Sequence, residues 1–206
     1  MDKNVLVFKN DRGGDLMVSL KSISTLIKEK KNITIFLSEI NESFRFLFKN
    51  IIVKKIKFNL DIYEKIRLFF FILTNNVGEI YILSPKNYFF YLAFIFRNIK
   101  FYAIVINGEK RYRPNLFLRK YLYKYEIIDR KSKINDGTSE LKQLRLVNNN
   151  AKFDYSTYNF LTPPKSVEYI NNLIPKNFYF FQFKENFFKK INWDLNKLEK
   201  FFDLLL

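Results

Sequence analysis

A glycine-bearing segment near the amino terminus, residues 9–15, holds residue types that could bind and activate a ligand. The adjacent Gly13 and Gly14 let the backbone approach a ligand closely and tolerate a positive φ angle. If a helix follows, its first amides could hold an anion, and Asp15 would be favoured by the helix dipole or act as a cap. A tight turn with a capping Asp explains the same spacing without any ligand. We expect this segment to contribute the following residues to a ligand site: Lys9, Asp11, Arg12, Gly13, Gly14 and Asp15.

The spacing of these glycines argues against the familiar nucleotide-binding loops. The dinucleotide motif GxGxxG is not matched, which disfavours a nicotinamide site, and the P-loop pattern GxxxxGK[ST] is also missing. Gly-Gly-Asp is shared with the GGDEF motif of diguanylate cyclases, but Leu16-Met17 follows here in place of Glu-Phe. The segment therefore predicts a ligand site of another kind.

The composition also limits the chemistry. The chain has no Cys and no His, which excludes disulfides, thiolate metal sites and the usual zinc ligands. The commonest general base is missing as well, so a carboxylate or a Tyr would have to handle protons. We expect neither a metal nor an organic cofactor.

Around this segment, apolar runs alternate with helical patterns through the first half of the chain. Each run is nearly continuous in Val, Ile, Leu and Phe, as in a strand that is buried on both faces of a parallel sheet. This alternation predicts an α/β, Rossmann-like open parallel sheet with helices on both faces, which binds ligands at the carboxyl ends of its strands. The expected strands are 5–8, 33–37, 51–58, 79–83 and 101–106, and the expected helices are 16–30, 43–49, 61–73 and 84–98.

The second half of the chain is less regular. We expect a basic, aromatic helix from Pro114 to about Tyr125 and a further helix at 139–146. Beyond these, we expect a helix at 165–173, a strand at 178–183 and a helix at 195–206. We therefore place an amino-terminal domain at residues 1–174. Residues 175–206 correspond to the first strand and helix of a second α/β domain, most of which the sequence is expected to lack.

The net charge of +16 and the isoelectric point of about 9.8 favour anionic partners, although solvated lysines of a lysine-rich proteome would give the same total. The basic segment 111–125 could meet acidic lipid or a phosphorylated glycolipid, or it could be a polar face over packed tyrosines. Without a recognisable nucleic-acid module, we do not expect nucleic acid as a partner. No signal peptide or uninterrupted apolar span is visible, so we expect a cytoplasmic protein. A non-catalytic basic α/β module for anionic membrane or nucleic acid remains the alternative to an enzyme.

Two parts of the chain resemble the ADP-heptose:lipopolysaccharide heptosyltransferase family, which consists of glycosyltransferases of GT-B fold. The first is the strand 5–8 followed by Lys9, by Gly14-Asp15 and by the helix 16–26. The second is the strand 178–183, the basic loop 184–192 and Trp193, which opens a helix. The chain departs from the family at Lys21, where a Pro is usual, at Gln182, near a frequent His, and at Ile191, where a basic residue usually stands.

The resemblance implies the amino-terminal half of a GT-B fold and transfer of a sugar from a nucleotide-diphosphate sugar to a cell-envelope glycan or lipopolysaccharide core. It implies that Asp15 is the general base and that Gly13 and Gly14 make room for the acceptor. Lys189 or Lys190 would face the donor pyrophosphate. The implied location is cytoplasmic, with peripheral contact to the inner face of an anionic membrane. We expect little or no transferase activity from this part alone, because GT-B enzymes close two domains around the donor.

Overall fold

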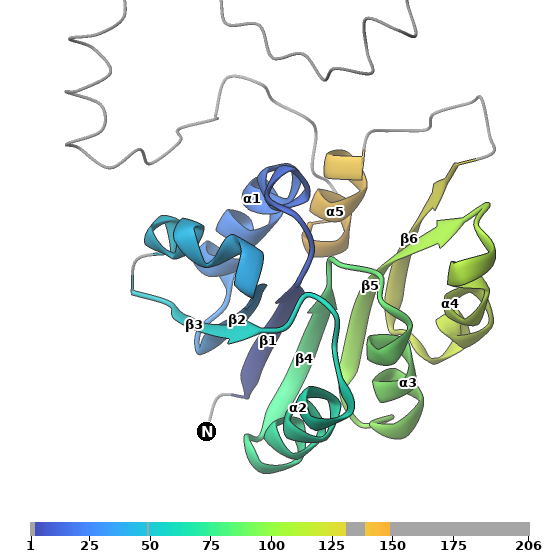
Figure 1. Ribbon diagram of the computed structural model, residues 1–206, viewed down its shortest axis with the longest axis horizontal. Helices are drawn as coiled ribbons and strands as arrows, with labels where there is room; N and C mark the ends of the chain where they lie inside the picture. Colours follow the sequence, from blue (N-terminus) through green and yellow to red (C-terminus); the bar gives the residue numbers. More distant parts are fainter. Residues whose placement is uncertain (1–2, 49, 131–138, 149–206) are drawn as a thin grey trace, which may run out of the picture. The chain divides into compact units, whose positions relative to one another are not determined.

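The computed structural model describes residues 3–48, 50–130 and 139–148, and it has an open parallel sheet at its centre (Figure 1). The six strands lie in the order β3-β2-β1-β4-β5-β6, and every neighbouring pair is parallel. This confirms the predicted fold class. The strands are β1 (Asn4–Lys9), β2 (Ile33–Ser38), β3 (Ile52–Ile56), β4 (Val77–Ile82), β5 (Lys100–Asn107) and β6 (Lys124–Asp129).

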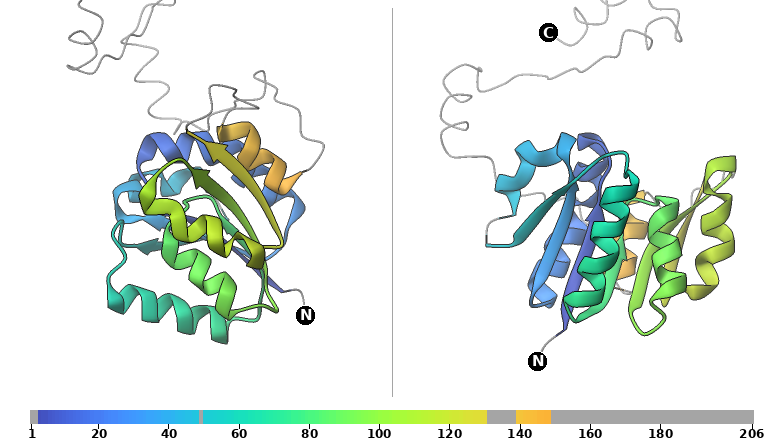
Figure 2. Two further views of the ribbon diagram at one scale, coloured as in Figure 1. Left: turned by 90° about the vertical axis from the view of Figure 1, so that its right-hand side faces the viewer. Right: turned by 60° about the horizontal axis from the view of Figure 1, so that its bottom comes forward.

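Helices cover both faces of this sheet. One face carries α1 (Gly13–Glu29) and α5 (Ser139–Val147), which contact each other. The other carries α2 (Ile62–Thr74), α3 (Asn87–Ile95) and α4 (Arg113–Leu118), which Figure 2 shows in a row beside the strands. Three 3-10 segments complete the described connections: η1 (Glu39–Leu47), η2 (Lys110–Tyr112) and η3 (Arg119–Tyr121).

The apolar core forms two layers, because successive strand residues point to opposite faces. In β1, Val5 and Val7 pack toward α1. Leu6 and Phe8 pack toward α2 and α3, and the Phe8 ring stacks on Phe89 with the ring centroids 4.3 Å apart. Burial on both faces explains why the sequence of each central strand is apolar without alternation.

The predicted helix from Pro114 to Tyr125 is wrong. The helical part ends as α4 and η3, and Lys124 already begins the edge strand β6. Ile127 and Ile128 anchor this strand from opposite faces, one in each core layer. An edge strand has one free side, so it carries more polar residues than the central strands, and its sequence does not show their pattern.

Several predicted element ends also shift. Helix α1 begins at Gly13, before the expected Leu16, and the segment expected at 43–49 is the 3-10 helix η1. Helix α3 begins at Asn87, because the amides of Leu83 and Ser84 both donate to Phe8 O and extend the end of β4. The predicted helix at 139–146 is confirmed as α5. The elements expected at 165–173, 178–183 and 195–206, and the proposed boundary at 174/175, lie outside the described residues.

Candidate functional site

A pocket of about 790 Å³ lies at the carboxyl ends of the strands. Its wall combines the connections that follow β1, β3, β4 and β5 with the end of β6 and the start of α5. The strand residues that line it are Lys9 of β1, Ile104 and Ile106 of β5 and Ile128 of β6. Beside them β1 and β4 are neighbours in the sheet, and there the order of the strands along the chain reverses. Such a switch point opens a crevice between loops that lead to opposite faces of the sheet, and it is where open α/β sheets bind ligands.

Hydrogen bonds from a neighbouring element fix the segment 9–15 at the edge of this pocket. The carbonyl oxygen of Asp11 accepts from Ser38 Oγ and from Asn41 Nδ2, each at 2.7 Å. Ser38 ends β2 and Asn41 lies in η1, and both are buried. The first loop is therefore held in place by the end of β2 and by η1.

Lys9 and Asp11 form an ion pair in which Nζ and Oδ2 are 2.7 Å apart. The Lys9 side chain is only 2% exposed and that of Asp11 is 19% exposed. Burial lowers the pKa of Lys9 and raises the pKa of Asp11, and their mutual attraction opposes both changes. Both residues line the pocket, as expected for substrate contacts, but their charges already face each other.

Asp15 lies in the first turn of α1, lines the same pocket and is exposed. Its carboxylate makes no hydrogen bond or ion pair with the described residues. The residue at the helix cap is Arg12, whose side chain makes no capping bond. Asp15 therefore does not act as the capping Asp, and it is left available to a ligand. Arg12 also lines the pocket, and it is exposed.

The two glycines differ from expectation and from each other. Both are helical and neither has a positive φ; among the described glycines, that conformation occurs at Gly108. A Cβ at Gly13 would lie 3.2 Å from the Phe44 ring, so Gly13 serves close packing against η1. A Cβ at Gly14 would meet nothing within 4 Å. Neither glycine is among the residues that line the pocket.

Four buried side-chain oxygens on the pocket-lining residues form no close hydrogen bond with the described residues: Asp11 Oδ1, Ser84 Oγ, Asn87 Oδ1 and Gln143 Oε1. The Ser84 hydroxyl nevertheless lies near enough to Asp11 to oppose the rise of its pKa. The two amides are oriented by their nitrogens, since Asn87 Nδ2 donates to Arg111 O at 3.0 Å and Gln143 Nε2 to Ser139 Oγ at 3.3 Å. Buried polar atoms normally have partners. Because three of the four can only accept, the pocket suits a ligand rich in hydroxyl or amine donors.

The rim of the pocket is cationic. Arg111 Nε lies 2.6 Å from Glu109 Oε2, and Arg130 pairs with the other oxygen of the same carboxylate. Two guanidinium groups therefore share one negative charge. Lys86 donates to Phe58 O and stands over the Phe58 ring, and burial lowers its pKa. The excess of positive charge would favour an anionic group on the ligand.

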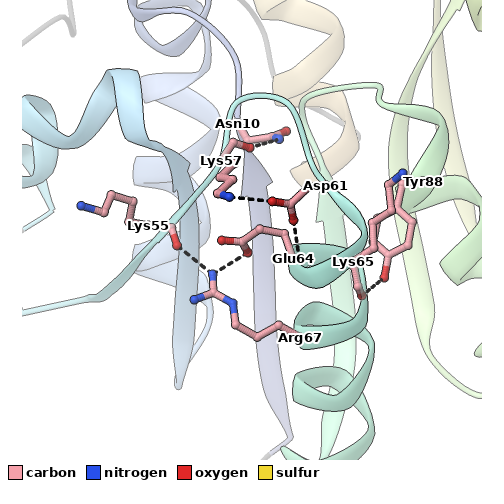
Figure 3. A network of polar contacts seen from close by, with 8 residues as sticks. All are labelled: Asn10, Lys55, Lys57, Asp61, Glu64, Lys65, Arg67 and Tyr88. Atoms are coloured by element: carbon pink, nitrogen blue, oxygen red, sulfur yellow. Dashed lines mark hydrogen bonds and ion pairs between the residues drawn. The ribbon is translucent and has the colours of Figure 1, made fainter.

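A separate polar network holds the connection between β3 and α2, which brings Phe58 and Asn59 to the pocket (Figure 3). The Asp61 carboxylate accepts from Glu64 N at 2.8 Å and pairs with Lys57 at 2.6 Å, which caps the start of α2. Asn10 Nδ2 donates to Lys57 O at 3.4 Å and links this connection to the first loop. These residues position the pocket wall.

The structure thus brings Lys9, Asp11, Arg12 and Asp15 to one pocket, whereas Lys189 and Lys190 lie outside the described residues. Within the described ranges, no group of three or more acidic side chains is arranged to hold a metal ion. Sequence reasoning missed Ser84, Asn87, Arg130 and Gln143. The first two directly follow β4, so the rule that ligands bind at the carboxyl ends of strands could have found them.

Two solved structures are similar to this chain. One is a glycosyl transferase family 9 structure from Veillonella parvula, at 17% identity and a TM-score of 0.49 over 70% of this chain. The other is a phenylacrylic acid decarboxylase from Aquifex aeolicus, at 9% identity and a TM-score of 0.42 over 75% of this chain and 99% of that one. This chain spans 40% of the length of the glycosyl transferase. No family model and no curated protein matches the sequence.

Proposed function

We propose that the described domain is the acceptor-side half of a glycosyltransferase, which transfers a sugar from a nucleotide-diphosphate sugar to a hydroxyl group of a cell-envelope glycan or glycolipid. The observation that carries this proposal is the composition of the pocket. An unpaired carboxylate, a set of unpartnered acceptor oxygens and a cationic rim lie together on its wall. This set fits a polyhydroxylated ligand that carries an anionic group. The resemblance of the segment 9–15 to heptosyltransferases supports the same conclusion.

Between the two carboxylates of the first loop, Asp15 is the better candidate for general base. The charge of Asp11 is held by Lys9 at 2.7 Å, whereas the Asp15 carboxylate has no partner in the described part of the chain. In the proposed reaction, Asp15 accepts the proton of an acceptor hydroxyl as its oxygen bonds to the anomeric carbon of the donor sugar. The bond from that carbon to the nucleotide diphosphate breaks, and the diphosphate leaves with the electron pair. Lys189 and Lys190 remain the candidates for its stabilisation.

Because this part alone is expected to show little transfer, the proposal is tested in a protein that carries both halves of a GT-B fold. A panel of nucleotide-diphosphate sugars and sugar phosphate acceptors is assayed by release of the nucleoside diphosphate. Asp15→Asn should lower the rate by about 100-fold or more. Its melting temperature should stay unchanged, because the side chain is exposed. Glu39→Gln removes an exposed carboxylate that does not line the pocket and is the matched control.

Calorimetry with the same nucleotide sugars and with glucose 1-phosphate separates binding from turnover. A folded wild-type chain that binds none of them would overturn the proposal. Equal rates for wild type and Asp15→Asn would remove Asp15 from the chemistry.

A further inference from the structure

The outer surface of the layer formed by α2, α3 and α4 leaves large apolar side chains in water. We call six of them the aromatic face; each is between 43% and 68% exposed. On α2, the inward stripe already consists of Glu64, Leu68 and Ile72, so the helix is apolar on its outward side as well. The aromatic face consists of Ile66, Phe70, Leu73, Phe94, Ile95 and Phe117.

Contacts between the helices hold this surface together. Tyr88 of α3 donates its hydroxyl to Lys65 O of α2 (Figure 3). The rings of Phe69 of α2 and Phe96, which directly follows α3, lie with their centroids 5.1 Å apart. The Phe94 ring contacts Tyr121 of η3 at 5.0 Å. The three helices therefore form one layer on this face of the sheet (Figure 2).

Cations without acidic partners lie on the aromatic rings of this surface. Arg97 stands over Phe94 and Tyr121, at 5.3 and 5.2 Å from the ring centroids. Lys120 stands 4.5 Å from the centroid of Phe117. Neither forms an ion pair with the described residues, in contrast to Arg111 and Arg130 of the pocket rim, which share Glu109.

We propose that the aromatic face is a membrane-docking surface that lies on a bilayer rich in anionic lipid. Apolar side chains would enter the boundary between headgroups and acyl chains, while Arg97 and Lys120 meet lipid phosphates. Within the described residues no helix is long and apolar enough to cross a bilayer, so the proposed contact is peripheral. It goes beyond the transferase function and does not depend on it.

The positive charge of the chain favours anionic lipid over the other possible occupants of the aromatic face. A second copy would set the same unpaired cations against each other, and its net charge is also +16. Residues 149–206 contain eight lysines and six acidic residues, so this part of the chain is itself net positive. Nucleic acid could use the cations and rings, but it has no use for the aliphatic Ile66, Leu73 and Ile95, since bases stack on aromatic rings.

The test is co-sedimentation of the full chain with vesicles of phosphatidylcholine, with or without phosphatidylglycerol, and a parallel titration with duplex DNA. The wild type should bind the anionic vesicles. Arg97→Gln with Lys120→Gln should weaken that binding by roughly 25-fold, at about fivefold for each charge. The matched control is Lys28→Gln with Lys31→Gln, which removes the same charge near the end of α1 and should change binding much less.

A second pair of variants tests the apolar contribution. Ile66→Gln with Leu73→Gln keeps good helix formers on α2 and should weaken vesicle binding several-fold. Ile52→Gln alters an equally exposed Ile of β3, outside the aromatic face, and is the control. Circular dichroism establishes that each variant is folded.

Three results would overturn the proposal. The first is wild-type binding that does not depend on the anionic lipid, and the second is equal losses in the test and control variants. The third is binding to DNA alone, weakened by the same substitutions, which would assign the surface to nucleic acid. Loss of vesicle binding with unchanged glycosyl transfer in solution would support docking independently of the enzyme.

Discussion

The pocket at the carboxyl ends of the strands and the aromatic face of α2, α3 and α4 depart from ordinary packing in opposite directions. At the pocket, polar oxygens such as those of Asn87 and Gln143 are withdrawn from water without a partner among the described residues. On the aromatic face, large side chains such as Phe70 and Phe117 stay in water although they are apolar. Between the two regions, the sheet buries its apolar side chains in the usual way.

One domain can therefore hold both buried polar atoms without a partner and exposed apolar side chains without cover. Unpartnered buried oxygens are relieved by a ligand that donates hydrogen bonds, whereas exposed apolar side chains are relieved by removal from water. The two regions should therefore respond to different partners, and a change in one should leave the other intact. Substitutions around the pocket, whose effects range from large to small, can test that separation.

The largest effect is expected at the buried ion pair under the pocket. Lys9→Met would leave the Asp11 carboxylate without its partner in a mostly buried position and should lower the free energy of unfolding by about 3 kcal/mol. Urea denaturation measures the change. Lys9→Met combined with Asp11→Asn should recover part of the lost free energy of unfolding. A double variant as unstable as the single one would show that charge pairing is not the cause.

Next in size is the effect of a rim cation on ligand affinity. Arg130→Gln should weaken binding of glucose 1-phosphate about tenfold, because one charge-assisted contact to the phosphate is lost. Calorimetry measures this, and glucose serves as the uncharged probe that should be unaffected. Arg67→Gln removes a guanidinium of α2 that pairs with Glu64 away from the pocket, and it should leave the affinity unchanged. Equal losses in both variants would point to net charge instead of the rim.

A smaller effect is expected at the cap of α2, and it depends on pH. The Glu64 amide and the Lys57 ammonium lower the pKa of Asp61 below 3.8. A carboxyl group with a lowered folded-state pKa stabilises the fold above its unfolded value, and this contribution is lost as the pH falls through the folded value. The stability gap between wild type and Asp61→Ala should therefore close below about pH 3.8. Thermal unfolding across the acid range measures it, and a gap that stays constant would argue against a charged cap.

The smallest effect distinguishes stability from binding at the edge of the pocket. Gly14→Ala should stabilise the fold by about 0.5 kcal/mol, since Gly14 is helical and its Cβ meets nothing within 4 Å. The resemblance implies that Gly14 makes room for the acceptor, so the same methyl group should weaken binding of glucose 1-phosphate. Gly13→Ala is the control, and its Cβ would press on Phe44 at 3.2 Å and bring no gain. Unchanged binding by a stabilised Gly14→Ala would place the ligand elsewhere.

Much of the architecture could be predicted, because a strand buried on both faces has a continuous apolar sequence. This signal identifies β1, β2, β4 and β5, and it fails at β6, where Lys124, Tyr125 and Glu126 lie at the free edge of the sheet. Apolar periodicity predicts a helix start at Leu16, because it marks only the packed part of α1, whereas Gly13 already begins the helix.

The site was predictable only where its residues share one loop. Lys9, Asp11, Arg12 and Asp15 are close in sequence, so their spacing alone is enough to group them. Gln143 and Arg130 reach the same pocket from α5 and from the end of β6, and local sequence gives no measure of such long-range proximity. The sequence also could not show that Arg12, and not Asp15, occupies the N-cap position of α1. That position depends on the backbone angles of Arg12.

The position of β1 has a consequence for how the chain folds. This first strand pairs with β2 on one side and with β4 on the other, so its second neighbour is made only after β2, β3 and α2 have been synthesised. At ordinary rates of translation that interval lasts several seconds. During this time one edge of an apolar strand remains open on the ribosome, where it could pair with another nascent chain. Closure by β4 ends this exposure, and a parallel sheet with such distant pairings is expected to fold slowly.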